Sequence, residues 1–174
     1  MRNRQKGFSL IELLIVVAII LIIAAIAIPN LLRSRIAANE SSAVGSLRTL
    51  VTAQVTYSST YPTVGFAATL GALAPTTGVP SSAQADLVDA QLAVGLKSGY
   101  ALGSSACTDG CSSDGNFNIT TANGVNITFE VYAGPVSQNR TGIRNFCTNE
   151  GGVIRQGANP STACDMTTAS PPVG

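Results

Sequence analysis

Glu12 is the residue whose position most needs a chemical explanation, because it lies inside a long apolar segment. The stretch from Phe8 to Ile28 has 21 residues, and only Ser9 and Glu12 interrupt its apolar character. An acidic side chain in the middle of a membrane costs about 2.5–3.5 kcal/mol on insertion scales, so such a group needs a partner or a purpose. Glu12 is therefore the first candidate functional residue.

Cysteine is the second residue type with chemical potential, and all four copies fall in the second half of the chain: Cys107, Cys111, Cys147 and Cys164. The spacings of three and sixteen intervening residues do not fit the C-x₂-C pattern of a four-thiolate zinc site, so disulfides are favoured. Three pairings are possible. We favour Cys107–Cys111, which closes a tight loop, and Cys147–Cys164, which ties the C-terminal tail to a strand.

No catalytic constellation is visible in the sequence. The chain has no histidine, and it has no nucleophile elbow, phosphate-binding loop or dinucleotide fingerprint. Asp109 and Asp114 lie in an oxygen-rich loop that has the composition of a calcium site, but the EF-hand ligand order is missing and a polar surface turn is favoured. We expect no enzyme activity, no metal and no cofactor.

The apolar segment, residues 8–28, predicts a helix about 31 Å long, which is enough to cross the hydrocarbon core of a bilayer. Arg2, Arg4 and Lys6 precede it, so the positive-inside rule places the N-terminus in the cytoplasm. Arg33 and Arg35 at the other end weaken this argument. The cysteines fall on the predicted outer side, where disulfides persist.

Residues 29–57 predict an amphipathic continuation of the same helix, with a kink at Pro29. Its apolar positions recur at spacings of three, four and seven residues, and its polar side carries Arg33, Glu40, Ser41, Arg48 and Gln54. A membrane anchor followed by a separate linker helix is the alternative. No Gly/Ser-rich linker separates the two halves, which favours one helix.

The remaining residues predict a loop with short helical turns over 58–98 and a sheet over 99–174. A turn of helix is expected near 67–73, and a second helix at 86–95. Candidate strands are residues 99–103, 117–121, 126–133, 143–148 and 152–155, and Asn123-Gly124 predicts a hairpin. We expect an α+β fold in which an antiparallel sheet of three to five strands packs on the outer half of the long helix.

Charge excludes one class of partner. The chain has 10 Lys+Arg and 9 Asp+Glu, and loss of residues 1–7 would leave seven basic against nine acidic side chains. No basic surface therefore argues for nucleic acid.

The motif Lys6-Gly7-Phe8-Ser9-Leu10-Ile11-Glu12-Leu13-Leu14 resembles the class III signal of type IV pilins and the related pseudopilins. The resemblance covers residues 1 to about 57. It implies that residues 1–7 are a leader peptide, that a prepilin peptidase cuts between Gly7 and Phe8, and that Phe8 is then methylated. It also implies that Glu12 pairs with the terminal amine of Phe8 in a neighbouring subunit during assembly.

The resemblance implies a structural protein: a single-pass inner-membrane precursor that the pilus assembly machinery adds to a helical homo-oligomeric filament outside the cell. Such filaments serve adhesion, twitching motility or DNA uptake. A pseudopilin of a type II secretion system is the alternative, and a membrane-anchored enzyme or binding domain is a third reading that the missing catalytic residues disfavour. Ala18, Ala24, Ala25 and Ala27 would permit close helix packing in a filament.

Overall fold

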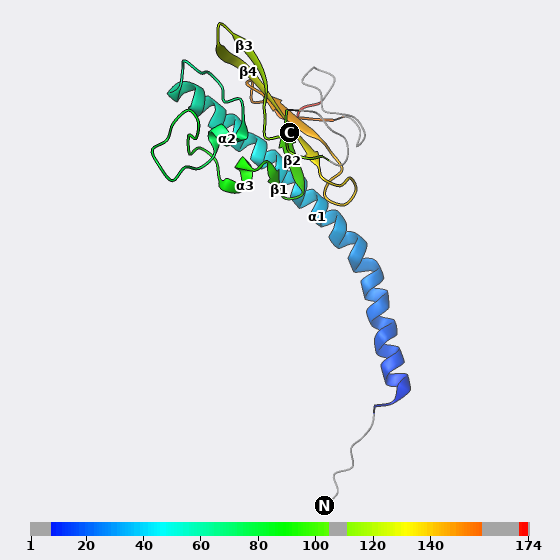
Figure 1. The fold of residues 1–174 in the computed structure, drawn as a ribbon. Coiled ribbons are helices and arrows are strands. Elements are labelled where there is room, and N and C mark those ends of the chain that lie inside the picture. The colour runs from blue at the N-terminus through cyan, green and yellow to red at the C-terminus, as the bar shows by residue number, and fades with distance from the viewer. Residues whose placement is uncertain (1–7, 105–110, 158–170, 174) are drawn as a thin grey trace, which may run out of the picture. The chain divides into compact units, whose positions relative to one another are not determined.

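The computed structural model describes residues 8–104, 111–157 and 171–173, and it divides into two compact units, Met1–Arg35 and Ile36–Gly174 (Figure 1). One long helix contributes to both units. The elements in chain order are α1 (Leu10–Thr60), α2 (Leu70–Leu73), α3 (Ala90–Ala93), β1 (Leu96–Lys97), β2 (Tyr100–Gly103), β3 (Asn118–Ala122), β4 (Val125–Pro135), β5 (Phe146–Asn149) and β6 (Arg155–Gln156). This is the α+β fold that the sequence predicts.

The part of α1 in the first unit is exposed on all sides. Among the described residues, α1 is the helix long and apolar enough to cross a membrane, and none of its most apolar window is buried. Pro29 lies inside α1, which continues through it. Proline has no N–H to donate to the preceding turn, and this is the reason for expecting a kink at Pro29. The kink itself stays a prediction.

From Ile36 onward, α1 buries a stripe of side chains against the rest of its unit. The buried apolar positions recur every three or four residues: Ile36, Ala43, Leu47, Leu50, Ala53 and Tyr57. This period matches one face of an α-helix. Two polar residues depart from the sequence prediction, because Glu40 is 6% exposed and Gln54 is 0% exposed, although both were expected on the solvent side.

Gln54 is buried because the loop after α1 supplies both of its hydrogen bonds. Its Nε2 donates to the carbonyl oxygen of Ala67 at 2.9 Å, and its Oε1 accepts from the N–H of Ala67 at 2.8 Å. Burying a side-chain amide costs little free energy when both its donor and its acceptor are hydrogen-bonded. Gln54 therefore links the loop to the helix through the same pair of backbone bonds that a neighbouring strand would make.

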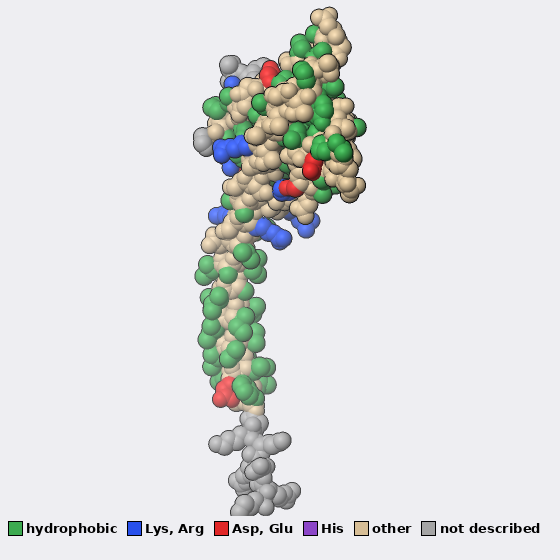
Figure 2. Space-filling view, turned by 90° about the vertical axis from the view of Figure 1, so that its left-hand side faces the viewer, with side chains coloured by type: hydrophobic (Ala, Val, Ile, Leu, Met, Phe, Trp, Pro, Cys, Tyr) green, Lys and Arg blue, Asp and Glu red, His purple; other side chains and the backbone are tan. Residues whose placement is uncertain are grey.

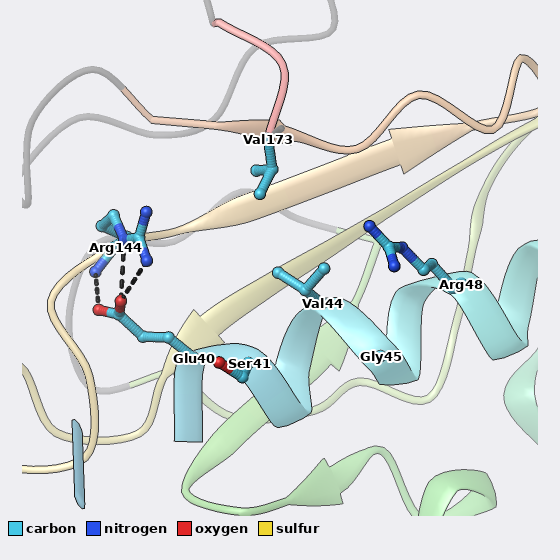
Figure 3. A pocket seen from close by; sticks show the side chains of 7 residues that line it. All are labelled: Glu40, Ser41, Val44, Gly45, Arg48, Arg144 and Val173. Carbon is cyan, nitrogen blue, oxygen red and sulfur yellow. Dashed lines mark hydrogen bonds and ion pairs between the residues drawn. The ribbon is translucent and has the colours of Figure 1, made fainter. Parts of the chain in front are cut away.

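Glu40 is buried because four donors from the loop before β5 surround it. Its Oε1 accepts from the N–H groups of Ile143 and Arg144 at 3.0 and 3.1 Å. Its Oε2 accepts from Arg144 Nε at 2.8 Å and lies 2.7 Å from Arg144 Nη2 (Figure 3). We call this set of contacts the Glu40 clamp. The Arg144 guanidinium also lies over the ring of Phe146, 5.4 Å from its centroid.

In the described ranges the sheet has six strands in the order β1-β2-β4-β5-β6, with β3 also paired to β4, and these strands all pair antiparallel. Glu130 of β4 pairs with Asn118 of β3 and with Asn149 of β5, so β3 and β5 lie on opposite edges of β4. The predicted three to five strands were too few. The two-residue strand β1 was missed, since Leu96-Lys97 is too short to show an alternating pattern.

The hairpin predicted at Asn123-Gly124 is confirmed. Ala122 of β3 pairs with Val125 of β4, and the two residues between them have φ of 51° and 79°. A two-residue type I′ turn needs positive φ at both central positions, which Asn and Gly tolerate best. Along β4, Phe129, Val131 and Ala133 are buried, as the alternation predicts. They pack in one core with Leu47, Leu50 and Tyr57 of α1.

The second predicted helix is shorter than expected, covering Ala90–Ala93 instead of 86–95. Asp86 has a φ of 55°, which is incompatible with an α-helix, and Asp89 is extended and caps the helix by accepting from Leu92 N–H at 2.6 Å. The two acidic residues that were predicted in a first helical turn are therefore a left-handed loop residue, Asp86, and an N-cap, Asp89.

Replacement of Glu40 by Gln should destabilise the unit that begins at Ile36 by about 2 kcal/mol, because an amide cannot match four donors and leaves buried N–H groups poorly paired. Chemical denaturation of a fragment starting at Ile36 measures this. Glu150→Gln is the matched control, since Glu150 is exposed and has no contact to lose within the described structure. An equal stability of the two variants would contradict the assigned role of the Glu40 clamp.

Thr148 offers the opposite prediction, because among the described residues its fully buried Oγ1 has no hydrogen-bond partner. Thr148→Val keeps the shape and removes an unsatisfied polar group, so it should stabilise the same fragment by about 1 kcal/mol. Thr120→Val on the exposed strand β3 should change stability by far less. Loss of stability in Thr148→Val would mean that the hydroxyl is satisfied in solution.

Candidate assembly interface

The apolar segment presents large hydrophobic side chains that no other part of its own described chain covers. Phe8 is 82% exposed and Ile26 is 72% exposed, and the large apolar side chains between them are 46–80% exposed (Figure 2). Burying one such side chain is worth about 1.5–3 kcal/mol. A contiguous apolar surface of this size marks a contact with lipid or with protein.

Glu12 lies at the start of this segment and takes part in capping the helix. Its Oε2 accepts from the N–H of Ser9 at 2.9 Å, and Leu13 N–H donates to the carbonyl oxygen of Ser9 at 3.3 Å. With α1 beginning at Leu10, Ser9 is the N-cap and Glu12 is the third helical residue. This is the carboxylate half of a capping box, and the helix dipole favours an anion there.

The capping contact leaves part of the Glu12 carboxylate available. Within the described part of the chain, Oε1 of Glu12 has no hydrogen bond. Phe8 directly precedes Ser9, so an amine created at Phe8 would be within one helical turn of the carboxylate of its own chain. Gly7 lies outside the described residues. This cap was not predicted, although Ser9-x-x-Glu12 is the spacing that signals one.

Small residues along the apolar segment fit close packing of helices. Ala18 and Ala25 are seven residues apart, which places them on the same face of α1, and both are exposed. Small side chains allow two helix backbones to approach closely. Their role in assembly stays a prediction.

Cysteine chemistry in the described residues is structural. Cys111 and Cys147 are both disulfide-bonded, and both are buried. Cys107 and Cys164 lie outside the described residues, so the favoured pairing of Cys107–Cys111 and Cys147–Cys164 stays a prediction.

Asp114, the described member of the loop considered for calcium, is occupied by hydrogen bonds within the chain. Its carboxylate accepts from the N–H and the hydroxyl of Ser104 and from the N–H of Asn116. Burial raises its pKa, but these hydrogen bonds outweigh burial and hold the pKa below its usual value. Asp109 is outside the described residues. Among those described, no three acidic, histidine or cysteine side chains gather as metal ligands would.

Comparison with known proteins supports a specific interpretation of the apolar segment. Residues 2–28 match the family described as the prokaryotic N-terminal methylation motif. The type IV major pilin protein PilA of Myxococcus xanthus is 52% identical over 54 residues, which is 31% of this chain and 24% of that protein. The type IV wide pilus major component PilA4 of Thermus thermophilus is 54% identical over 57 residues, which is 33% of this chain and 43% of that protein.

The similarity is confined to part of each chain, since the match spans about a quarter of one relative and less than half of the other. No solved structure matches the fold significantly. The sheet and its loops therefore stand on their own geometry. The methylation motif covers the whole of the apolar segment and both relatives are pilins, so the N-terminal third of this chain is similar to type IV pilins.

Proposed function

We propose that the chain is a structural subunit of a type IV pilus. The observation that carries the proposal is the apolar segment, which is exposed along almost all of its length and has an acidic residue, Glu12, in its first helical turn. Lipid covers such a surface in the inner membrane. After extraction from lipid, packing against copies of the same segment buries it again, and a heterologous contact of this kind repeats without closing into a ring.

The precursor is held in the inner membrane with its N-terminus in the cytoplasm, and prepilin peptidase removes residues 1–7. The new amine at Phe8 is methylated and pairs with Glu12 of a neighbouring subunit. Two opposite charges in an apolar filament core attract strongly, whereas either one alone is penalised. The pilus assembly machinery then extends an extracellular filament. Both relatives are named as pilus components, which favours this function over that of a secretion pseudopilin.

Processing is tested directly by intact and N-terminal peptide mass spectrometry of filaments sheared from cells that express the chain. The expected subunit lacks residues 1–7 and begins at Phe8 with one added methyl group. A filament subunit that still begins at Met1 would contradict both the cleavage and the methylation. A processed chain that is absent from sheared filaments would contradict the role of a major subunit.

The role of Glu12 is tested with two variants that separate its charge from its capping contact. Glu12→Gln keeps an oxygen that accepts from Ser9 N–H but removes the charge, and Glu12→Ala removes both. Loss of one charge-pairing interaction worth about 1.4 kcal/mol changes an equilibrium tenfold, so we expect filament yield to fall by at least about tenfold in both variants.

The amount of subunit in the membrane serves as the control, and it should match the wild type in both variants because the apolar segment is intact. Normal filament yield for Glu12→Gln would show that the charge is dispensable. A loss seen only for Glu12→Ala would assign Glu12 to helix capping instead of charge pairing.

A further inference from the structure

A groove of about 290 Å³ lies in the unit that begins at Ile36, on the solvent side of α1 (Figure 3). We call it the Arg48 groove. It is lined by Glu40, Ser41, Val44, Gly45, Arg48, Arg144 and Val173. The residues come from α1, from the loop before β5 and from the end of the described chain.

Counting only residues that the structure describes, the groove carries one uncompensated positive charge, that of Arg48. Arg144 is neutralised by Glu40, whose two oxygens are already occupied in the Glu40 clamp. Arg48 is exposed, and within the described structure it has no ion pair or hydrogen bond from its guanidinium. Figure 3 shows that its guanidinium points back over α1 toward Val44 and Val173. The Arg48 guanidinium beside the apolar side chains of Val44 and Val173 is suited to binding an acidic side chain, whose carboxylate pairs with the cation while its methylene groups contact the valines.

Gly45 in the floor of the groove is unexplained by packing inside the chain. A Cβ added at this position meets no atom of the described residues within 4 Å, and Gly45 lies in the interior of α1. Glycine there is less favourable than alanine by about 0.8–1 kcal/mol. A glycine that the subunit itself does not need is consistent with a contact made by another molecule.

We propose that the Arg48 groove receives an acidic side chain of a second copy of this chain. Among the described acidic residues, Asp86 and Glu150 are exposed and have no ion pair or side-chain hydrogen bond of their own. Neither lines the groove. A cation on one surface and a free carboxylate on another give a head-to-tail contact that repeats along a filament. This inference rests on the proposed function and adds a second contact between subunits outside the apolar segment.

Charge reversal tests the groove in the full-length chain, with filament yield measured relative to subunit in the membrane. Arg48→Glu should lower the yield by about tenfold or more, because it places like charges together at the contact. Arg48→Lys keeps the charge and should stay close to the wild type. Arg140→Glu is the matched control, since Arg140 is an exposed arginine outside the groove.

Rescue identifies the partner. If Glu150 fills the groove, Arg48→Glu combined with Glu150→Arg recovers the yield, and if Asp86 fills it, the combination with Asp86→Arg does so. The proposal is overturned if Arg48→Glu assembles normally, if Arg140→Glu loses as much as Arg48→Glu, or if neither double variant recovers.

Gly45 gives a second readout that a role within the subunit would not produce. Gly45→Leu should leave the melting temperature of the subunit unchanged or higher, since the site is open, and should lower filament yield by filling the groove. A lower melting temperature with normal filaments would assign Gly45 to the fold of the subunit and contradict the proposal.

Failure of this inference is distinguishable from failure of the proposed function. Normal filaments from both the wild type and Arg48→Glu would overturn the inference alone. Absence of filaments from the wild type, with the assembly machinery present, would overturn both. Binding of inorganic phosphate that is lost in Arg48→Glu, with filament yield unchanged, would assign the groove to a free anion and also overturn the contact between copies.

Discussion

The exclusion of water from the apolar segment is the constraint on which the rest of the molecule depends. Residues 8–28 are exposed within the subunit, and the unit beginning at Ile36 has a core of its own that does not use them. The chain therefore separates two tasks. One unit is folded by contacts within the subunit, and the other is stable only when lipid or other subunits cover it. In the proposed function, exposure that would be a liability in a soluble protein drives assembly.

A single helix serves both units, and the composition of its two parts follows from this. The N-terminal part has an apolar surface on all sides, as expected for a helix surrounded by apolar neighbours. The part from Ile36 to Thr60 has one buried face. On it, backbone groups of the loop that follows α1 hold the side chain of Gln54, and backbone groups of the loop before β5 hold that of Glu40. Both residues connect α1 to segments that follow it in the chain, and both hold those segments through hydrogen bonds instead of apolar contact.

The sequence predicts those features that depend on neighbouring residues. The apolar segment, the period of α1 and the Asn123-Gly124 hairpin are local patterns, and the structure contains all three. Glu40 was misplaced because its partners, Ile143 and Arg144, are more than a hundred residues away, and no helical periodicity encodes them. The groove at Arg48 likewise exists only through tertiary contacts, whereas β1 pairs locally with β2 and was missed because its two residues show no alternating pattern. The leader cleavage and the pairing of Glu12 rest on a local motif and on similarity to pilins.

The Glu40 clamp has a mechanical consequence. Beside the clamp, Asn39 Nδ2 donates to the carbonyl oxygen of Thr141 at 2.8 Å. Asn39 and Glu40 therefore both bond to the loop before β5, and they lie near the start of the part of α1 that belongs to the folded unit. In the proposed filament, held together by the apolar segments, tension would enter each subunit along α1 and load these hydrogen bonds before those further along the helix. Several hydrogen bonds loaded together at this point resist rupture better than the same bonds broken in succession, so the clamp protects the sheet from being peeled away from the helix under load.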